Sequence, residues 1–299
     1  MAEAAAAAGV AETARAKLNL DLLVLGRRSD GYHELDSLVV FAEVGDRLAL
    51  EHGDGLALET AGPFAPELPA AGEDIVTRAA RLLLAETLGV PPRGARIRLE
   101  KNLPVAAGIG GGSADAAATL RGLNRLWGLG LDGSTLRELG LALGADVPVC
   151  VHGRPARLRG VGERLDPVRG LPEIPLVLAN PRRPLPTGRV FAALDPDLPR
   201  PPREEGLPAR ASLTRLVAWL LDTRNDLEAP AIELEPAVAE ALGLLRAEPD
   251  CWLARMSGSG ATCFGVFTRP EAAEAAAERL RAARPGWWIA ATRAGGEPV

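Results

Sequence analysis

The sequence contains very little lysine. Of its 34 basic residues, only Lys17 and Lys101 are lysines, and the rest are arginines. In a chain that uses arginine almost everywhere, a lysine indicates a position that requires a compact ammonium rather than a planar guanidinium. Lys17 is therefore a candidate functional residue. The simpler alternative is that Lys17 lies on the solvated face of an ordinary strand.

Cysteine is scarce as well, and its positions do not suggest pairing. Cys150, Cys251 and Cys263 are odd in number and show no CxxC spacing, which argues against a disulfide framework. Two of them lie in apolar runs that are typical of buried strands. We therefore expect reduced core thiols in a cytoplasmic protein.

The N-terminus lacks the features of a targeting segment. Met1–Val10 is rich in alanine but carries no basic residue, and it is too short to span a bilayer. We expect residues 1–13 to form a disordered tail, and we expect no membrane association.

The chain also has no block of basic residues. Its net charge is −5, with 47% hydrophobic and 24% charged residues. A mildly acidic globular protein of this kind is a poor binder of nucleic acid, although a local anion site remains open. The 299 residues suffice for two domains with cores. We place the boundary near 153–160, between domains at 14–156 and 157–299.

What the sequence does contain is a dense glycine cluster. Four glycines lie between residues 108 and 112, and the next fifteen residues lack proline and repeat apolar side chains at helical spacing, at Ala116, Leu120, Leu123 and Trp127. A helix that begins after such a loop offers backbone N–H groups and the positive end of its dipole, and glycines let a polyphosphate approach. The stretch predicts an anion-binding loop.

Two common phosphate motifs do not fit this loop. A Walker A motif needs Lys followed by Ser or Thr, whereas Gly112 is followed by Ser113 and Ala114. The dinucleotide fingerprint would need glycine at Ser113 and a surrounding repeat of strands and helices, which is missing. A mobile glycine turn remains the alternative.

Polar residues that could carry chemistry lie in three other places. Lys17 and Asn19 alternate with leucines, which predicts a strand with one polar face. Tyr32, the only tyrosine, and His33 lie in a predicted turn, where they could contact a planar heterocycle; alternatively, Tyr32 anchors the turn to the core. Asp146 precedes an apolar run that we expect to be a buried strand, so it is either a general base or the cap of a turn.

The remaining pattern mixes strands and helices. We expect a hairpin turn at Val44-Gly45-Asp46, a Ser/Gly loop that runs into an apolar strand within 256–267, a turn or cap at Asn225-Asp226, and a proline-rich connector at 195–210. Helices are expected near 73–88, 134–143, 212–221, 236–247 and 270–283, and strands at 96–101, 176–179 and 287–292.

These motifs occur together in the order of a known family. The chain resembles the GHMP kinases through the PxxxGxGGGS loop at Pro104–Ser113 and through Ser257-Gly258-Ser259-Gly260. The resemblance runs from about Ala14 to Phe267. Further motifs resemble those of family members that act on a cytidylated sugar alcohol: Ala16-Lys17-Leu18-Asn19-Leu20, Asp30-Gly31-Tyr32-His33-Glu34-Leu35, Gly144-Ala145-Asp146-Val147-Pro148, Pro186-Thr187 and Asn225-Asp226.

The resemblance implies an α+β fold of two domains with the active site in the cleft between them. It implies phosphorylation of a sugar-alcohol hydroxyl in the non-mevalonate isoprenoid pathway, with ATP as its Mg²⁺ complex. The chain would act on a small molecule as a monomer or weak homodimer.

The resemblance also assigns residues to roles. Lys17 and Asp146 would be the catalytic pair. Asn19, His33 and Thr187 would bind substrate, and Tyr32 and Phe191 would sandwich the cytosine ring. The ATP phosphates would lie on the loop formed by Pro104, Val105, Ala106, Ala107, Gly108, Ile109, Gly110, Gly111, Gly112, Ser113 and Ala114.

The loop departs from the family pattern at its end. Where the family usually has Gly-Ser-Ser-Asn, this chain has Gly112-Ser113-Ala114-Asp115, so a hydroxyl is lost and a carboxylate replaces an amide. A carboxylate beside a phosphate site is unfavourable unless it points away or binds the cation. We assign no metal ligand; Ser113 is a candidate.

Two alternative functions remain. A GHMP kinase acting on mevalonate, homoserine or a sugar would have no use for Tyr32 and His33 as cytosine contacts. A catalytically silent nucleotide-binding module would have no need of both Lys17 and Asp146.

Overall fold

The computed structural model describes residues 9–29, 31–70, 72–86, 94–195, 206–208 and 210–296. These residues group into two compact units, each built from separate stretches of the chain. Unit 1 takes its described residues from 1–15, 45–105 and 111–153, and unit 2 takes them from 16–44, 106–110 and 154–299. Strands β1 (Val10–Asn19) and β3 (His33–Gly53) contribute residues to both units.

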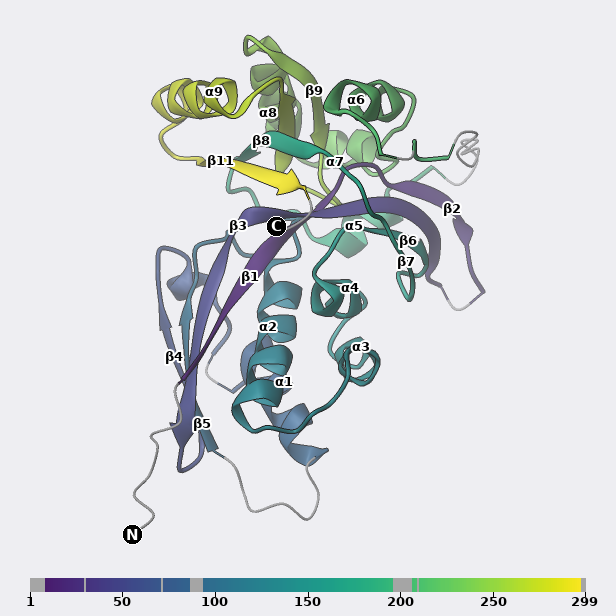
Figure 1. Ribbon diagram of the computed structural model, residues 1–299. Coiled ribbons are helices and arrows are strands. Elements are labelled where there is room, and N and C mark those ends of the chain that lie inside the picture. The colour runs from purple at the N-terminus through teal and green to yellow at the C-terminus, as the bar shows by residue number, and fades with distance from the viewer. Residues whose placement is uncertain are drawn as a thin grey trace. The chain divides into compact units, whose positions relative to one another are not determined.

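Unit 1 combines a small sheet with helices on one side of it (Figure 1). Strand β5 (Gly94–Glu100) pairs antiparallel with the second half of β3 and parallel with β4 (Leu56–Ala61). A short 3-10 helix, η1 (Ala65–Glu67), follows β4. The helices of this unit are α1 (Ile75–Ala85), α2 (Gly111–Leu126), α3 (Gly133–Leu141) and α4 (Val147–His152).

Helix α2 lies at the centre of unit 1. Ten of its sixteen residues are buried, and five of those ten are alanine or glycine. A Cβ on Gly122 would lie 2.7 Å from Leu50 Cδ1 on β3, so a larger residue there would displace that leucine. Small side chains therefore let the sheet and the neighbouring helices approach α2 closely.

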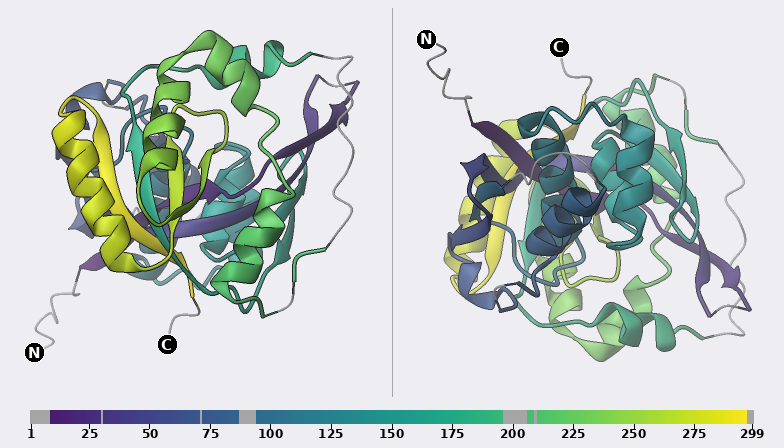
Figure 2. Two further views of the ribbon diagram at one scale, coloured as in Figure 1. Left: turned by 90° about the horizontal axis from the view of Figure 1, so that it is seen from above. Right: turned by 90° about the horizontal axis from the view of Figure 1, so that it is seen from below.

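Unit 2 contains antiparallel strands covered by helices (Figure 2). Strands β2 (Leu23–Arg27) and β6 (Ala156–Gly160) pair with the first half of β3, and β7 (Arg164–Pro167) pairs with β6. The order β11 (Trp288–Gly295), β8 (Glu173–Asn180), β10 (Cys263–Phe267), β9 (Cys251–Met256) follows. The helices are α5 (Thr187–Ala192), α6 (Leu213–Leu221), α7 (Glu228–Leu234), α8 (Ala237–Ala247) and α9 (Pro270–Ala283), of which α8 and α9 pack on these strands.

Most predicted elements are confirmed. Helices α1, α3, α6, α8 and α9 and strands β5, β8 and β11 lie where the patterns placed them. Asp74, Asp132 and Ser212 cap the first three of these helices through their side chains, and proline opens α9. Helix α7 was not predicted, because the whole segment between the helices expected near 212–221 and 236–247 was interpreted as a loop.

The hairpin predicted at Val44-Gly45-Asp46 is wrong, because β3 continues through these residues. Gly45 is needed for a close approach rather than for a turn: a Cβ there would lie 2.5 Å from Ala14 O on β1. Asp46 is fully buried. A Gly-Asp pair that resembles a turn locally is therefore fixed in a strand by its tertiary neighbours.

The strand predicted after Asp146 is also wrong. Val147–His152 forms α4, with Pro148 in its first turn, where proline is tolerated because its missing N–H would have no partner in the helix. Gly153 ends the helix in the left-handed conformation, with φ of 64°. An apolar run of this length does not distinguish a buried strand from a buried helix by periodicity.

The disordered tail predicted for 1–13 is wrong in its second part. Residues 1–8 lie outside the described residues, but β1 begins at Val10. Glu12 on this strand forms ion pairs with Arg121 and Arg125 of α2, at 2.9 and 2.7 Å. Most of the predicted connector at 195–210 lies outside the described residues.

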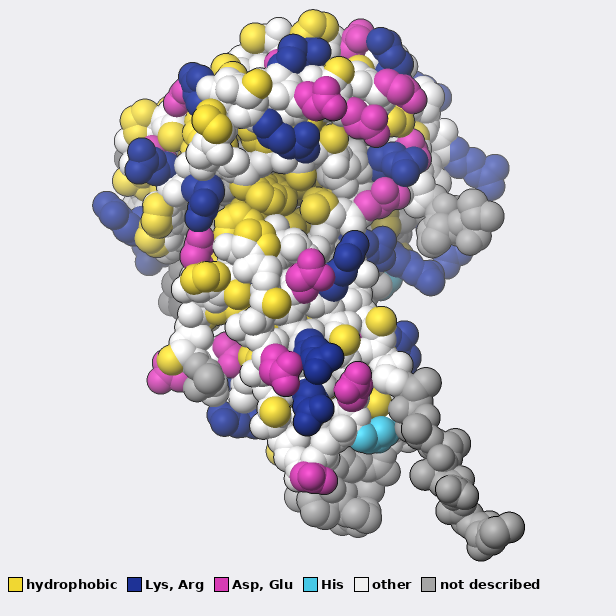
Figure 3. All heavy atoms as spheres, turned by 90° about the vertical axis from the view of Figure 1, so that its left-hand side faces the viewer, with side chains coloured by type: hydrophobic (Ala, Val, Ile, Leu, Met, Phe, Trp, Pro, Cys, Tyr) yellow, Lys and Arg dark blue, Asp and Glu magenta, His cyan; other side chains and the backbone are white. Residues whose placement is uncertain are grey.

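Within the described part of the chain, no helix combines the length and the apolar character needed to cross a membrane. On the face drawn in Figure 3, basic and acidic side chains are interspersed. Arg293 on β11 pairs with Glu43 and Glu173.

Candidate functional site

The glycine loop is held in unit 2 by direct contact with the Ser/Gly loop at 257–262. Thr262 donates to the carbonyl of Ala107 from its backbone N–H at 3.1 Å and from its hydroxyl at 2.6 Å. The Ser257 hydroxyl donates to the carbonyl of Gly108 at 3.2 Å. The two loops are therefore joined through main-chain carbonyls of the glycine loop.

The two loops approach so closely that side chains are excluded between them. A Cβ on Gly108 would lie 2.4 Å from Gly260 O and 2.8 Å from Ser257 O, and one on Gly258 would lie 2.8 Å from Gly108 O. The φ angles of Ala106, Gly108 and Gly110 are 51°, 74° and 63°. Such left-handed residues alternating along a loop turn successive N–H groups toward one side, which makes an anion-binding concavity.

Lys17 lies beside the last part of this loop. Its backbone N–H donates to the carbonyl of Ile109 at 2.9 Å, and its side chain is 4% exposed. A Cβ on Gly110 would lie 3.2 Å from Lys17 Cβ and 3.4 Å from Lys17 Cε. The solvated-face alternative for Lys17 is therefore wrong, because the side chain is buried along Gly110.

Asn19 is buried on the same strand, two residues further along. Its backbone N–H donates to the Ser257 hydroxyl at 3.1 Å, and its side-chain N–H donates to the Ser37 hydroxyl at 2.7 Å. Among the described residues, no donor reaches the buried Asn19 Oδ1. The amide is thus fixed in orientation and retains an acceptor oxygen.

The predicted substrate residues on other elements also lie in unit 2. The rings of His33 and Phe191 are 4.9 Å apart at an angle of 30°. Thr187, at the start of α5, shares a hydrogen bond with the Ser259 hydroxyl at 2.8 Å. Tyr32 is 63% exposed, so most of its surface is accessible to a ligand.

Asn225 contributes to this arrangement in a way that the sequence did not indicate. Its amide donates to the carbonyls of Met256 and Gly258, both at 2.8 Å. Its oxygen also accepts from Leu227 N, as predicted for a turn residue. Asn225 therefore fixes the start of the Ser/Gly loop.

Asp146 belongs to unit 1, whereas Lys17 belongs to unit 2. Asp146 is half-buried at the residue before α4 and makes no side-chain capping bond to that helix.

The first turn of α2 lies over a buried charge cluster in unit 1, which we call the Lys101 cluster: Lys101, Asp46 and Asp115. The Lys101 Nζ lies 2.5 Å from Asp46 Oδ2 and 2.6 Å from Asp115 Oδ2. Burial raises the pKa of Asp115 to about 8, although the charge of Lys101 acts to lower it. Burial would lower the pKa of Lys101, but the carboxylates of Asp115 and Asp46 outweigh it, so this pKa is raised.

The Lys101 cluster settles the orientation of Asp115. The sequence left open whether this carboxyl points outward or binds a cation; it does neither, because it pairs with Lys101 in the interior. The scarcity of lysine was a signal for Lys101 as much as for Lys17. Among the described residues, no group of three or more His, Cys, Asp or Glu side chains could hold a metal ion.

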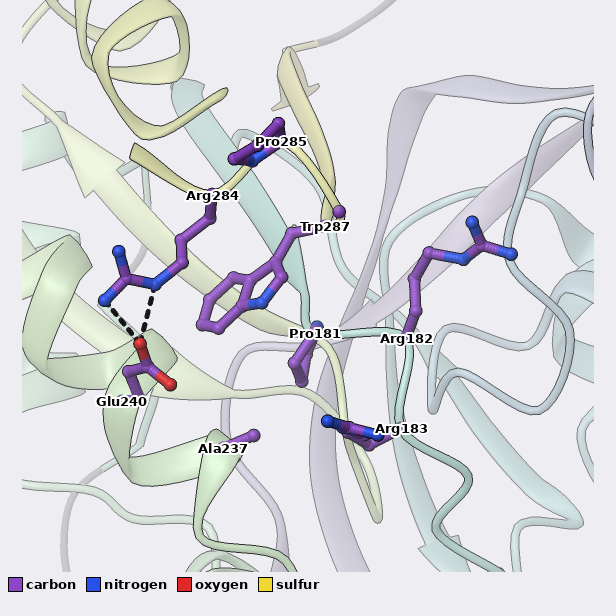
Figure 4. Close-up of a pocket in the computed structure, with 9 residues that line it drawn as sticks. Pro181, Arg182, Arg183, Ala237, Glu240, Arg284, Pro285 and Trp287 are labelled. Atoms are coloured by element: carbon purple, nitrogen blue, oxygen red, sulfur yellow. Dashed lines mark hydrogen bonds and ion pairs between the residues drawn. The ribbon is translucent and has the colours of Figure 1, made fainter. Parts of the chain in front are cut away.

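A pocket of about 490 Å³ lies elsewhere in unit 2 (Figure 4). The Arg284 side chain pairs with Glu240 at 2.5 Å and lies 6.0 Å from the centre of the Trp287 ring. None of the predicted site residues lines it. Its lining residues are Pro181, Arg182, Arg183, Ala237, Glu240, Arg284, Pro285, Gly286 and Trp287.

The close packing of the two loops predicts the effect of a single methyl group. Gly108→Ala should lower the free energy of unfolding by about 2 kcal/mol, because it combines a left-handed φ with a backbone clash. Gly112→Ala is the control: a Cβ there would have its nearest neighbour at 3.8 Å. Chemical denaturation of both variants checks this, and equal stability would show that the loops do not pack as described.

The sequence matches one enzyme family over both of its domains. Residues 74–154 match the N-terminal domain of the GHMP kinases, and residues 209–286 match their C-terminal domain. A protein of Cereibacter sphaeroides named 4-diphosphocytidyl-2-C-methyl-D-erythritol kinase is 55% identical over 95% of this chain and 98% of its own length. A protein of the same name from Parvibaculum lavamentivorans is 51% identical over 96% of this chain and 99% of its own length.

Solved structures agree with this. A crystal structure of 4-(cytidine 5'-diphospho)-2C-methyl-D-erythritol kinase superposes with a TM-score of 0.80 at 40% identity, covering 96% of this chain and all of the other. Homoserine kinase from Cytophaga hutchinsonii shares the fold, with a TM-score of 0.71 at 16% identity. The match covers 98% of this chain and 97% of that one. The predicted α+β fold is confirmed, and the chain belongs to the GHMP kinase family.

Proposed function

We propose that this chain transfers the γ-phosphoryl group of ATP to the 2-hydroxyl of 4-diphosphocytidyl-2-C-methyl-D-erythritol, in the non-mevalonate route to isoprenoid precursors. The observation that carries the proposal is the side-chain-free contact between the glycine loop and the Ser/Gly loop, with Lys17 buried along Gly110. The relatives with this name match nearly the whole chain. A free-thiol composition supports a cytoplasmic location, and we propose a monomer or weak homodimer.

The nucleotide would be held by the residues from Pro104 to Ala114. Successive N–H groups of a left-handed loop and the N-terminus of α2 suit the charge of a polyphosphate. Gly110 and Gly111 fit this role because neither presents a Cβ to a ligand. Magnesium would arrive with ATP and neutralise phosphate charge; Ser113 is the candidate protein ligand.

Phosphoryl transfer requires a proton acceptor for the attacking hydroxyl and a positive charge beside the reacting oxygens. We assign Asp146 to the first role: its carboxylate takes the proton of the 2-hydroxyl as that oxygen bonds to the γ-phosphorus and ADP leaves. We assign Lys17 to the second role, because its compact ammonium lies in a buried site along Gly110, where electrostatic interactions are stronger than in water.

The cytidine part of the substrate would be recognised by aromatic side chains. We propose that Tyr32 and Phe191 stack on the cytosine ring and that His33, whose ring lies 4.9 Å from that of Phe191, binds its edge. Asn19 and Thr187 would position the sugar alcohol, since both are fixed by hydroxyl groups of the Ser/Gly loop.

Substrate choice gives the most direct test of this function. In an assay of ADP release, kcat/KM for the diphosphocytidyl substrate should exceed that for 2-C-methyl-D-erythritol by at least ~100-fold, because the smaller alcohol leaves the aromatic site empty. Phe191→Leu should narrow this preference about tenfold. Equal activity on both alcohols would favour another GHMP kinase activity, and no ADP release with either would favour a silent nucleotide-binding module.

The catalytic assignment gives a separate prediction. Lys17→Arg and Asp146→Asn should each lower kcat by at least ~100-fold, because the first replaces a compact ammonium by a planar group and the second removes the proton acceptor. The dissociation constant of ATP for Asp146→Asn should change by less than about threefold. Steady-state kinetics with calorimetric ATP binding measures both, and wild-type turnover in either variant would refute the pair.

A further inference from the structure

We propose that Lys101 is a positioning residue of the phosphate-binding loop: its ammonium ties the entry of the loop, through Asp46, to the exit of the loop, through Asp115. This inference rests on the proposed function only in taking the glycine loop as the nucleotide site.

The Lys101 cluster is unusual for a feature that serves stability alone. Lys101, Asp46 and Asp115 are at most 1% exposed. Removing charges from water is expensive, and apolar residues of similar volume often fill such a site with equal or better stability. The cluster also joins one ammonium to two carboxyl groups. The buried charges therefore suggest that the cluster has a role other than stabilising the core.

The entry of the loop is fixed through Asp46. Its Oδ1 accepts hydrogen bonds from Asn102 N at 2.5 Å and Leu103 N at 2.8 Å, and its Oδ2 accepts from Lys101. Asn102 and Leu103 are the two residues immediately before Pro104. The backbone that leads into the loop is thus held from β3.

The exit of the loop is fixed through Asp115 and Gly111. Gly111 is the first residue of α2, and a Cβ there would lie 3.3 Å from Lys101 Nζ. Asp115 follows four residues later, on the same face of the helix, and accepts from the same ammonium. The first turn of α2 therefore lies directly against Lys101.

The proton balance of the cluster suits a site beside phosphates. Asp115 Oδ1 is buried without a hydrogen-bond partner among the described residues, and the charged groups that act on it are Lys101 and Asp46. Burial raises the pKa of Asp115 to about 8, although the charge of Lys101 acts to lower it. A negative charge on Asp115 beneath the loop is therefore disfavoured, and an uncharged Asp115 would resemble the asparagine usual in the family.

Variants that separate positioning from folding test the proposal. Lys101→Met leaves both carboxyl groups without a cation and is expected to unfold readily, whereas Lys101→Met with Asp115→Asn removes one of them and should fold. Arg98→Met is the matched control, because that residue lies on β5 with its side chain 59% exposed. Melting temperature is measured for each, and binding of ATP–Mg²⁺ is measured by calorimetry.

The double variant should fold and still bind ATP at least ~10-fold more weakly than wild type, while Arg98→Met binds it normally. Wild-type affinity in the folded double variant would show that the cluster is only structural and overturn the proposal. If wild type released no ADP with the cytidylated alcohol, the proposed function would be contradicted instead. The Lys101 proposal would not be affected, because ATP binding requires no acceptor alcohol.

A pH profile gives a readout that a structural role would not change. ATP affinity is measured across this pH profile for wild type and for Asp115→Asn, which lacks the ionisable carboxyl group. Above about pH 8, wild type should bind ATP more weakly than Asp115→Asn, because ionised Asp115 places a negative charge beneath the loop. Parallel profiles would contradict the proposal.

Discussion

The structure of unit 2 depends on a contact between two stretches of bare main chain. Gly108 meets Gly260 and Ser257 at distances that no Cβ would permit, and the hydroxyls of Ser257 and Thr262 bond to carbonyls of the opposite loop. These bonds are made by carbonyls of the glycine loop, and its left-handed residues turn N–H groups toward one side, as an anion-binding loop requires. Lys17, Asn19 and Thr187 are each bonded to one of these two loops, so one contact positions several candidate functional groups together.

In unit 1, the Lys101 cluster connects separate elements in a similar way. It joins β3, the end of β5 and α2 through one buried ammonium. Because Asp115 pairs with the Lys101 ammonium in the interior, its charge is offset beside the phosphate-binding loop. The two lysines thus have different tasks: Lys17 lies along the loop and is assigned to the chemistry, and Lys101 lies beneath the first turn of α2 and supports it.

The sequence predicted what local patterns determine. Helices with apolar periodicity and a capping side chain, such as α1, or an opening proline, such as α9, were found. So was the strand–loop–helix order around the glycines. The continuous strand β3 and the burial of Asp46 were missed because they are decided by residues distant in the chain, Ala14 against Gly45 and Lys101 against Asp46. Helix α4 was missed because its short apolar run is compatible with a buried strand as well as with a buried helix. The candidate site followed mainly from family resemblance and residue scarcity, and the role of Asn225 had no local signal beyond its turn.

In the proposed site, the N–H groups of the glycine loop and of the first turn of α2 hold the nucleotide phosphates. Hydrogen exchange followed by mass spectrometry, with and without ATP–Mg²⁺, measures this at the amides themselves. Amide hydrogen exchange in peptides covering 106–114 should slow when nucleotide is added. Unchanged exchange there, with protection confined to another part of the chain, would contradict the proposed site.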